Sequence, residues 1–256
     1  MNKKRVVDYI VKWLTDYLNQ AGSDGYVVGV SGGVDSALTS ALAALTNKTV
    51  VLVTMPIKQS IDEIERGNLH IKKLVSEHQN CIHHELDLNR TFAEFQKIFR
   101  HPLTSELAFA NSRSRLRMVV MYQVAASMNL LVCGTGNKIE DFGIGFFTKY
   151  GDGGVDVSPI ADLYKSEVYD LAKYLKVDGS ILKAMPTDGL WDDGRIDEDQ
   201  IGATYKDLER VMKIQDKKAL SNDDKQVYEI FLKLHNRNLH KMSLPPVCKI
   251  PTALKT

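Results

Sequence analysis

The sequence predicts an α/β fold, a Rossmann-like, doubly wound parallel β-sheet with helices on both faces. Over the first 175 residues, short apolar runs alternate with segments whose apolar residues recur every three or four positions. Strands separated by helices pair in parallel and have both faces covered. Glycine-rich turns follow two of the apolar runs, at 29–33 and 134–137. Because such sheets bind ligands at the carboxyl ends of their strands, both turns are candidate binding loops.

The first half predicts a regular order of elements. Residues 1–18 have the pattern of an amphipathic helix, with an apolar face that consists of Val6, Ile10, Trp13, Leu14 and Tyr17. A strand over 26–31 leads into a helix over 34–45, whose expected buried face is Val34, Ala37, Leu38, Ala41, Leu42 and Leu45. The alternation continues with strand 49–55 (closed by Pro56), helix 61–78, strand 81–88, helix 91–99, helix 105–127 and strand 130–133.

The second half is less regular. Residues 146–159 are rich in glycine and predict an irregular segment, whereas helices are expected over 163–175 and, for the most part, 196–214. Between these helices, residues 186–195 are polar and turn-rich; they form either a mobile lid or an ordinary surface loop. We expect one domain, with a core over about 22–175 and a C-terminal lid and helical segment over about 176–256.

The composition excludes several classes of function. Lys and Arg (33) balance Asp and Glu (32), so no overall charge favours nucleic acid or a membrane surface as partner. No apolar run approaches the ~20 residues that span a bilayer. Acidic residues interrupt the N-terminal segment, which argues against a signal peptide. Three widely spaced cysteines, Cys81, Cys133 and Cys248, are typical of a cytoplasmic protein with reduced thiols.

The first glycine turn has the composition of a phosphate-binding loop. It follows the apolar run Tyr26-Val27-Val28 and reads Gly29-Val30-Ser31-Gly32-Gly33-Val34-Asp35-Ser36. A turn between a strand and a helix directs backbone N–H groups and the positive helix end to one point. Glycine lets the backbone approach phosphate oxygens closely. Asp35 is placed to hold a magnesium ion, since a carboxylate beside phosphates needs a cation between them.

This loop differs from the commoner nucleotide-binding loops. No lysine lies between Tyr26 and Asn47, which excludes a Walker loop, and no G-x-G-x-x-G is present. The string SGGVDS resembles the loop of the ATP pyrophosphatase (PP-loop) superfamily. That resemblance implies an adenine nucleotide alpha hydrolase-like fold and cleavage of ATP to AMP and pyrophosphate. The alternative is a simple glycine turn in which Ser36 caps an ordinary helix.

The second half resembles NAD synthetase. The resemblance rests on 134–175 (GTGNKIEDFGIGFFTKYGDGGVDVSPIADLYKSEVYDLAKYL), 111–118 (NSRSRLRM), 186–202 and the pair His240-Lys241, in collinear order. It implies ATP-dependent amidation of nicotinic acid adenine dinucleotide (deamido-NAD) to NAD through an acyl-adenylate. These signatures begin near residue 29, so we expect no glutaminase domain, free ammonia as the nitrogen donor, and a homodimer.

The resemblance also implies roles for particular residues. ATP would be bound by Gly29, Val30, Ser31, Gly32, Gly33, Val34, Asp35, Ser36, Thr135, Lys165 and Thr187. Deamido-NAD would be bound by Arg115, Lys149, Asp156, His240 and Lys241. Mg²⁺ would be held by Asp35 and Glu140. Relative to many members of the family, the chain has one extra residue between this glutamate and the TKYGDGG run. Counting back from Lys149 therefore selects Asp141, instead of Glu140, as the second metal ligand. No catalytic base is assigned.

Helical spacing restricts the arginines of the predicted helix over 105–127. Arg113 and Arg117 are four residues apart and share a face, whereas Arg115 points away from them. The three arginines therefore cannot all contact the same ligand. Asp152 either takes part near the adenylate or ammonia site or only makes a turn.

Two other functions are alternatives. One is another amidating or thiolating PP-loop enzyme; thiolation calls for catalytic cysteines, and tRNA as substrate calls for a basic surface. The other is a module that binds ATP without turnover, which has less need of two metal carboxylates and a phosphate-binding lysine.

Overall fold

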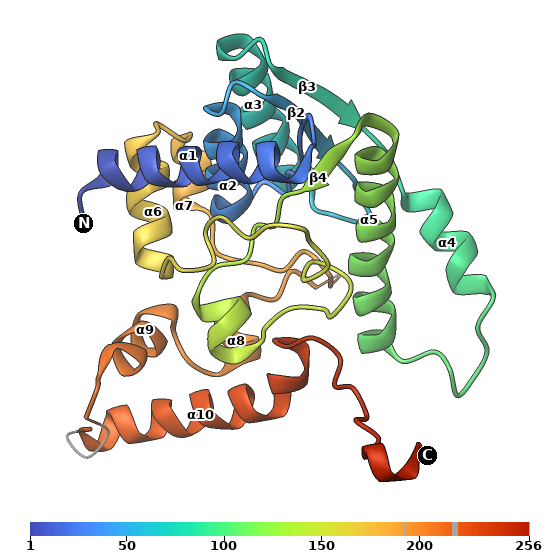
Figure 1. Cartoon of the computed structure of the whole chain (residues 1–256), viewed down its shortest axis with the longest axis vertical. Coiled ribbons are helices and arrows are strands. Elements are labelled where there is room, and N and C mark those ends of the chain that lie inside the picture. The colour runs from blue at the N-terminus through green and yellow to red at the C-terminus, as the bar shows by residue number, and fades with distance from the viewer. Residues whose placement is uncertain (192, 217–219, 256) are drawn as a thin grey trace.

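The computed structural model describes residues 1–191, 193–216 and 220–255 (Figure 1). Within these residues, four parallel strands form a sheet in the order β3-β2-β1-β4. The strands are β1 (Gly25–Gly29), β2 (Thr49–Thr54), β3 (Cys81–Glu85) and β4 (Leu130–Val132). Val27 at the centre pairs with Val51 of β2 and Val132 of β4. The predicted α/β class and parallel sheet are confirmed.

The chain order of the strands creates a crevice beside β1. The chain runs outward from β1 to β2 and β3, and then returns to place β4 on the other side of β1. Such a reversal is a topological switch point, where connections leave the sheet in opposite directions. The loops that follow β1 and β4 therefore border one opening at the carboxyl edge of the sheet.

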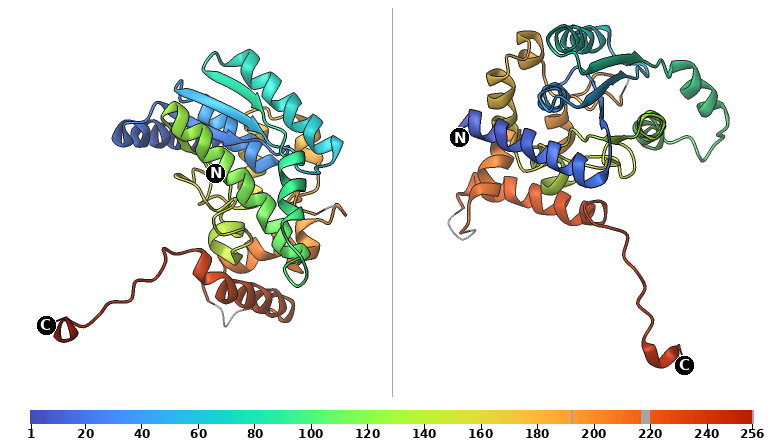
Figure 2. Two further views of the ribbon diagram at one scale, coloured as in Figure 1. Left: turned by 90° about the vertical axis from the view of Figure 1, so that its right-hand side faces the viewer. Right: turned by 45° about the horizontal axis from the view of Figure 1, so that its top comes forward.

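Helices cover both faces of the sheet (Figures 1 and 2). One face packs on α1 (Lys3–Ala21), α2 (Val34–Ala44), α3 (Ile61–Glu77), α6 (Lys165–Tyr174) and α7 (Gly179–Lys183). The other face packs on α4 (Asn89–Lys97) and α5 (Glu106–Met128). Because side chains alternate along a strand, Tyr26 and Val28 enter the first core while Val27 enters the second. Of the described helices, none is long and apolar enough to cross a bilayer.

A third hydrophobic cluster lies below the carboxyl edge of the sheet in Figure 1. It is built by a π-helical turn, η1 (Ile139–Ile144), with α8 (Asp197–Ile201), α9 (Tyr205–Lys213) and α10 (Asn222–Asn238). After η3 (Leu239–Lys241) the chain extends away from the body and ends near a short turn, η4 (Thr252–Leu254) (Figure 2). The sequence did not predict η1; α7 and α10 fall in the helical segment expected over about 176–256, for which it gave no separate bounds.

The expected apolar face of the first helix is partly wrong. Its buried residues are Val7, Ile10, Leu14 and Leu18. Trp13 and Tyr17 are more than a third exposed, and their ring centroids lie 5.7 Å apart at the surface. Burial is decided by where α2 and α6 contact the helix, and large aromatic rings at the edge of that contact remain partly solvated.

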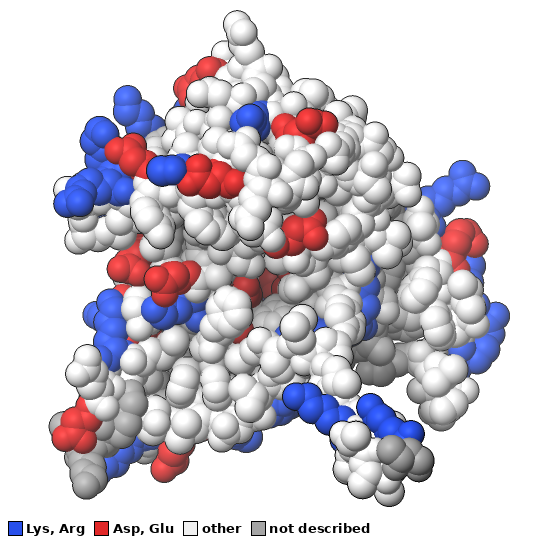
Figure 3. All heavy atoms as spheres, in the orientation of Figure 1, with Lys and Arg blue, Asp and Glu red and all other residues white. Residues whose placement is uncertain are grey.

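Two further boundaries differ from the prediction. The helix expected over 196–214 is split, because Gly202 has φ 82° and ends α8 before Thr204 caps α9. In the predicted helix over 34–45, Leu45 is only partly buried and follows the last residue of α2. On the face shown in Figure 3, basic and acidic side chains are interspersed. Within α1, Lys4 and Asp8 form an ion pair at 2.7 Å.

Candidate functional site

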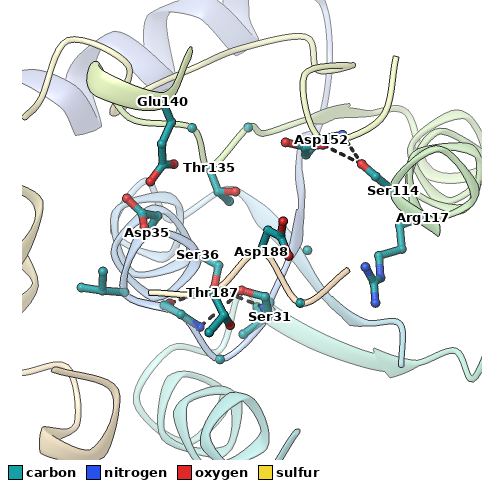
Figure 4. Close-up of a pocket in the computed structure, with 18 of the residues that line it drawn as sticks. Ser31, Asp35, Ser36, Ser114, Arg117, Thr135, Glu140, Asp152, Thr187 and Asp188 are labelled. Atoms are coloured by element: carbon teal, nitrogen blue, oxygen red, sulfur yellow. Dashed lines mark hydrogen bonds between the residues drawn. The ribbon is translucent and has the colours of Figure 1, made fainter. Parts of the chain in front are cut away.

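A cavity of about 280 Å³ opens at the carboxyl ends of β1 and β4. The loop after β1, the loop after β4 and the start of η1 form one side of it (Figure 4). Residues of α3, α5 and the segment 184–190 close the remainder. All residues to which the sequence assigns ATP line this cavity: Gly29, Val30, Ser31, Gly32, Gly33, Val34, Asp35, Ser36, Thr135, Lys165 and Thr187.

The glycine loop is held in place by close backbone packing against α3. Gly32 has φ +89°, and a Cβ there would lie 2.3 Å from the carbonyl oxygen of Glu63. Only glycine fits this position without strain. Gly67, one turn further along α3, also faces the loop, with its Cβ position 3.4 Å from the Gly32 nitrogen.

The loop leaves the N-terminus of α2 open toward the cavity. Gly33 is the N-cap residue and provides no side-chain hydrogen bond. Ser36 does not cap the helix; its hydroxyl donates to the Gly33 carbonyl at 3.0 Å and accepts from the Ser31 backbone N–H at 3.2 Å. The first-turn N–H groups and the positive helix end can therefore bind an anion. The loop is built as a phosphate cradle rather than as a simple turn.

A lysine lies between two carboxylates at one end of the cavity. Nζ of Lys165 is 2.6 Å from Oδ2 of Asp35 and 2.9 Å from Oε1 of Glu140. The lysine is buried, and the two carboxylates are exposed by only 17% and 16%. Asn137 Nδ2 also donates to Asp35 Oδ1 at 3.0 Å. Asp35 begins α2, Glu140 lies in η1 and Lys165 begins α6, so three distant segments meet here.

Burial and charge shift the pKa values of this group in different directions. Burial raises the pKa of Asp35, and the negative charge of Glu140 adds to this effect, against the pull of Lys165. Burial also opposes ionisation of Glu140, but Lys165 and the hydrogen-bond donors around the carboxylate outweigh it and lower the pKa. The pKa of Lys165 is raised because the two carboxylates outweigh its burial. The lysine is therefore a fixed cation.

Tyr205 and Asp197 complete the cluster, and the sequence did not predict either. The Tyr205 hydroxyl lies 2.6 Å from Glu140 Oε1 and 3.1 Å from Asp197 Oδ2. A hydroxyl has one hydrogen and cannot donate to both carboxyl groups at once. Burial, together with the charge of Glu140, raises the pKa of Asp197 to about 7. A protonated Asp197 can donate to Tyr205, which then donates to Glu140.

The two carboxylates around Lys165 are suitable ligands for a magnesium ion. Asp35 and Glu140 already converge on one cationic group, and their carboxylates face each other across the loop in Figure 4. Mg²⁺ prefers oxygen ligands and is often held by one or two carboxylates together with substrate phosphates and water. In the part of the chain that the structure describes, no group of three or more Asp, Glu, His or Cys could hold a metal by itself. Phosphate and water ligands would complete such a site.

Asp141 also lines the cavity but is oriented differently. Its two carboxylate oxygens lie over Gly136, where a Cβ would be 2.1 Å from each of them. Burial raises its pKa well above the ordinary value, and the charge of Glu140 adds to the shift. Lys165, the shared cation, contacts Glu140 and not Asp141. The geometry favours Glu140 as the second metal ligand.

Helix α5 presents its arginines on opposite sides, as the helical spacing predicts. Arg117 lines the cavity, and its Nε donates to the Met55 carbonyl at 3.1 Å. Arg113 is buried on the same side and donates to the Leu190 carbonyl at 3.0 Å. Arg115 is exposed, and its Nε donates to the Lys149 carbonyl at 3.2 Å.

The residues assigned to deamido-NAD do not line this cavity. Lys149 Nζ donates to the His240 carbonyl at 2.6 Å, next to the Arg115 contact. Lys241 Nζ donates to the carbonyl of Phe147. These four assigned residues thus gather around the segment 147–149, whereas the fifth is apart from them.

The fifth residue, Asp156, forms hydrogen bonds within the fold. Its carboxylate accepts from the hydroxyl of Tyr122 at 3.0 Å and from the backbone of Val132 at 2.7 Å. It therefore joins α5 to β4 at the edge of the sheet.

Asp152 both makes a turn and faces the cavity. Its Oδ1 accepts from the Ser114 hydroxyl at 2.6 Å and from the Thr148 N–H at 3.0 Å, which orders the 148–152 turn. Burial raises its pKa despite these donors. It lies across the cavity from Asp35 in Figure 4.

The segment 186–195 contributes to the cavity wall. Thr187 donates from its hydroxyl to Glu63 Oε1 at 2.7 Å, and Asp188 accepts from the indole N–H of Trp191 at 3.2 Å. Residue 192 of this segment is outside the described residues. Residues 186–190 therefore form part of the cavity wall, and the choice between a mobile lid and an ordinary surface loop stays a prediction.

Comparisons with known proteins agree with this arrangement. The family model described as NAD synthase matches residues 6–245. The chain is 37% identical to the NH(3)-dependent NAD(+) synthetase of Alkaliphilus oremlandii, over 97% of this chain and 98% of the relative. It is also 37% identical to the NH(3)-dependent NAD(+) synthetase of Archaeoglobus fulgidus, over 98% of each chain.

Two experimental structures are similar over nearly the whole chain. The NMN synthetase from Francisella tularensis superposes with a TM-score of 0.87 at 30% identity, over 98% of this chain and 100% of that one. The NH3-dependent NAD synthetase from Campylobacter jejuni superposes with a TM-score of 0.78 at 26% identity, over 97% and 100%.

Proposed function

The chain belongs to the NAD synthase family, and on this premise we propose that it is an ammonia-dependent ligase that converts deamido-NAD to NAD with ATP. The observation that carries the proposal is the single cavity that combines a phosphate cradle with a buried lysine and two converging carboxylates. Such a set of groups suits binding and cleavage of a nucleoside triphosphate. A module that only senses ATP would not require it.

The reaction has two steps. The substrate carboxylate, already ionised at neutral pH, attacks the α-phosphorus of ATP, and pyrophosphate leaves. Ammonia then adds to the acyl carbon, and AMP leaves with the former carboxylate oxygen. Adenylation is needed because a carboxylate is a poor electrophile. Holding the substrate carboxylate beside the α-phosphorus would provide much of the acceleration through positioning.

The described residues divide this work between them. The loop N–H groups and the α2 N-terminus would bind the triphosphate, with Lys165 adding a fixed positive charge. Asp35 and Glu140 would hold Mg²⁺. When bound, the ion supplies neutralisation of the charge on the departing pyrophosphate. Asp152, on the opposite wall, would receive the ammonium ion.

A second substrate has specific support. The Francisella tularensis structure is titled an NMN synthetase, and it superposes with a TM-score of 0.87. In addition, none of the side chains assigned to deamido-NAD lines the described cavity. Amidation of nicotinic acid mononucleotide is therefore a second candidate for this chain.

A product assay separates these possibilities. The protein is supplied with magnesium-ATP, ammonium or glutamine, and either the acid dinucleotide or the acid mononucleotide. We expect AMP and the amide in equal amounts with ammonium and the dinucleotide, and little product with glutamine. A kcat/KM that is higher for the mononucleotide would establish the second candidate, whereas absence of ATP cleavage with either acid would contradict both.

We also propose a homodimer, as the resemblance implies. Exposed apolar residues on α5, such as Val119, are available for such an interface. Sedimentation of the purified protein at micromolar concentration, with a mass near twice 28.7 kDa, is the expected result.

A further inference from the structure

Arg117 is a half-buried cation that lines the cavity, and the fold leaves one of its terminal nitrogens unused. Its Nε donates to the Met55 carbonyl. Its Nη2 is shielded from solvent and has no hydrogen-bond partner among the described residues. Burial lowers the pKa of this guanidinium to about 10, and the neighbouring Arg113 adds to the effect. A shielded donor without a partner costs stability, which suggests that the missing partner of Nη2 is a ligand.

The carboxylates near Arg117 accept hydrogen bonds from other residues. Glu63 accepts from the Thr187 hydroxyl at 2.7 Å. Asp152 accepts from the hydroxyl of Ser114 at 2.6 Å. Asp188 accepts hydrogen bonds from residues of its own segment, among them the Leu190 N–H at 3.0 Å. These carboxylates moderate the charge of Arg117 at a distance, yet none of them forms an ion pair with it in the described part of the chain.

The position of Arg117 separates it from the triphosphate site. In Figure 4 the Lys165 partners Asp35 and Glu140 lie at one end of the cavity, and Arg117 extends from α5 at the other. Ser114, which holds Asp152, precedes Arg117 by three residues and so lies on the same helix face. An anion at Arg117 would therefore lie on the α5 side of the cavity rather than beside the acidic cluster at the start of α2.

We propose that Arg117 binds the carboxylate of the nicotinate substrate, so that it selects the acid over the amide product. This inference rests on the proposed function. A guanidinium matches a carboxylate with two parallel hydrogen bonds. The ligand loses its negative charge when the carboxylate becomes an amide, and the site then favours release of the product. Arg117 would thus determine specificity, since it would contact the carboxylate that the reaction converts to an amide.

The test compares binding of acid and amide by Arg117 variants. Arg117→Met keeps the apolar stem and removes the charge, Arg117→Lys keeps the charge without the planar fork, and Arg90→Met on exposed α4 is the control. Titration calorimetry measures binding of the acid and amide dinucleotides and mononucleotides without ATP. We expect Arg117→Met to weaken binding of the acid roughly 10- to 150-fold, the range for hydrogen bonds to a charged group. Binding of the amide should change less than about twofold, and Arg117→Lys should recover part of the loss.

Thermal unfolding of the unliganded variants distinguishes a ligand site from a structural residue. Because Nη2 has no protein partner and the substitution removes only the Nε contact with Met55, Arg117→Met should unfold close to the temperature of the wild type. A Tm lowered by several degrees, or failure of the variant to fold, would show that the arginine stabilises the fold and would overturn the proposal. Equal losses for acid and amide would overturn it too. A higher KM for ATP with unchanged binding of the acid would assign Arg117 to a nucleotide phosphate instead.

The wild-type product assay keeps the two proposals separate. If the wild type forms no amide from either acid, the proposed function fails, whatever the variants show. If the wild type is active and Arg117→Met retains the preference for acid over amide, only the assignment of Arg117 fails.

Discussion

The Tyr205 hydroxyl donates a hydrogen bond of 2.6 Å to Glu140, 65 residues earlier in the chain. Through this bond, α9 and the C-terminal helices are connected to the carboxylate that shares Lys165 with Asp35. The Lys165 amine also lies 4.7 Å from the centre of the Tyr205 ring. Tyr205 thus contacts two members of the cluster, Glu140 and Lys165.

Tyr205→Phe should raise the Mg²⁺ concentration needed for activity. Without the hydroxyl, Glu140 loses a donor that fixes its orientation, and loss of such a supporting contact commonly weakens metal binding roughly 10- to 100-fold. Magnesium titration of activity, and of ATP binding by calorimetry, measures the effect. Tyr9→Phe on the exposed side of α1 is the control. An unchanged magnesium requirement would show that Tyr205 serves only packing.

Substitutions of the three acidic side chains identify the metal ligands. Asp35→Asn should reduce turnover roughly 100-fold or more, because an amide cannot replace a carboxylate that neutralises a divalent cation. Near-normal activity would remove Asp35 from this role. Between Glu140→Gln and Asp141→Asn, we expect the former to raise the magnesium requirement, since Glu140 shares Lys165 with Asp35. The opposite result would make Asp141 the ligand.

Gly32→Ala should abolish ATP binding. The new Cβ would lie 2.3 Å from the Glu63 carbonyl at a positive φ, so the loop must move away from α3. The thermal shift produced by magnesium-ATP should disappear while the unliganded protein remains folded. Gly179→Ala, where no atom lies within 4 Å of the new Cβ, should keep the full shift. A normal shift in the Gly32 variant would mean that the loop does not bind phosphate in this conformation.

His70 should make stability dependent on pH below neutrality. It is 2% exposed between α2 and α3, with Nε2 2.9 Å from the Ser40 hydroxyl, and burial lowers its pKa to about 4. The unfolded chain takes up a proton near the ordinary value of 6.5, whereas the folded protein does so only near 4. The stability from neutral His70 is therefore full above pH 6.5 and is lost as the pH falls toward 4.

Urea unfolding at pH 7 and pH 5 measures this dependence. At about 1.4 kcal/mol for each pKa unit, His70 should account for a loss of roughly 2 kcal/mol between these two values. His70→Gln should remove that part of the loss, whereas His84→Gln, at an exposed position of β3, should not. Equal losses in wild type and His70→Gln would contradict the lowered pKa.

The choice between Glu140 and Asp141 shows where a local prediction stops. Counting along the sequence leaves Glu140 and Asp141 as alternatives. In the structure the segment forms a π-helical turn, in which the Gly143 N–H donates to the Lys138 carbonyl five residues earlier at 2.9 Å. A wider turn accommodates one more residue than an α-helical turn. It lets Glu140 face Lys165 while Asp141 packs over Gly136.

The sequence alone determined the features that depend on near neighbours. The alternation of strands and helices, the strand-loop-helix unit at Gly29–Ser36 and the opposite directions of Arg115 and Arg117 follow from periodicity, glycine chemistry and helical spacing. The tertiary structure decided which side chains meet. Asp35 and Lys165 are 130 residues apart, and no local pattern marks Tyr205 as a partner of Glu140. Because these contacts depend on how whole elements pack, only the folded chain reveals them.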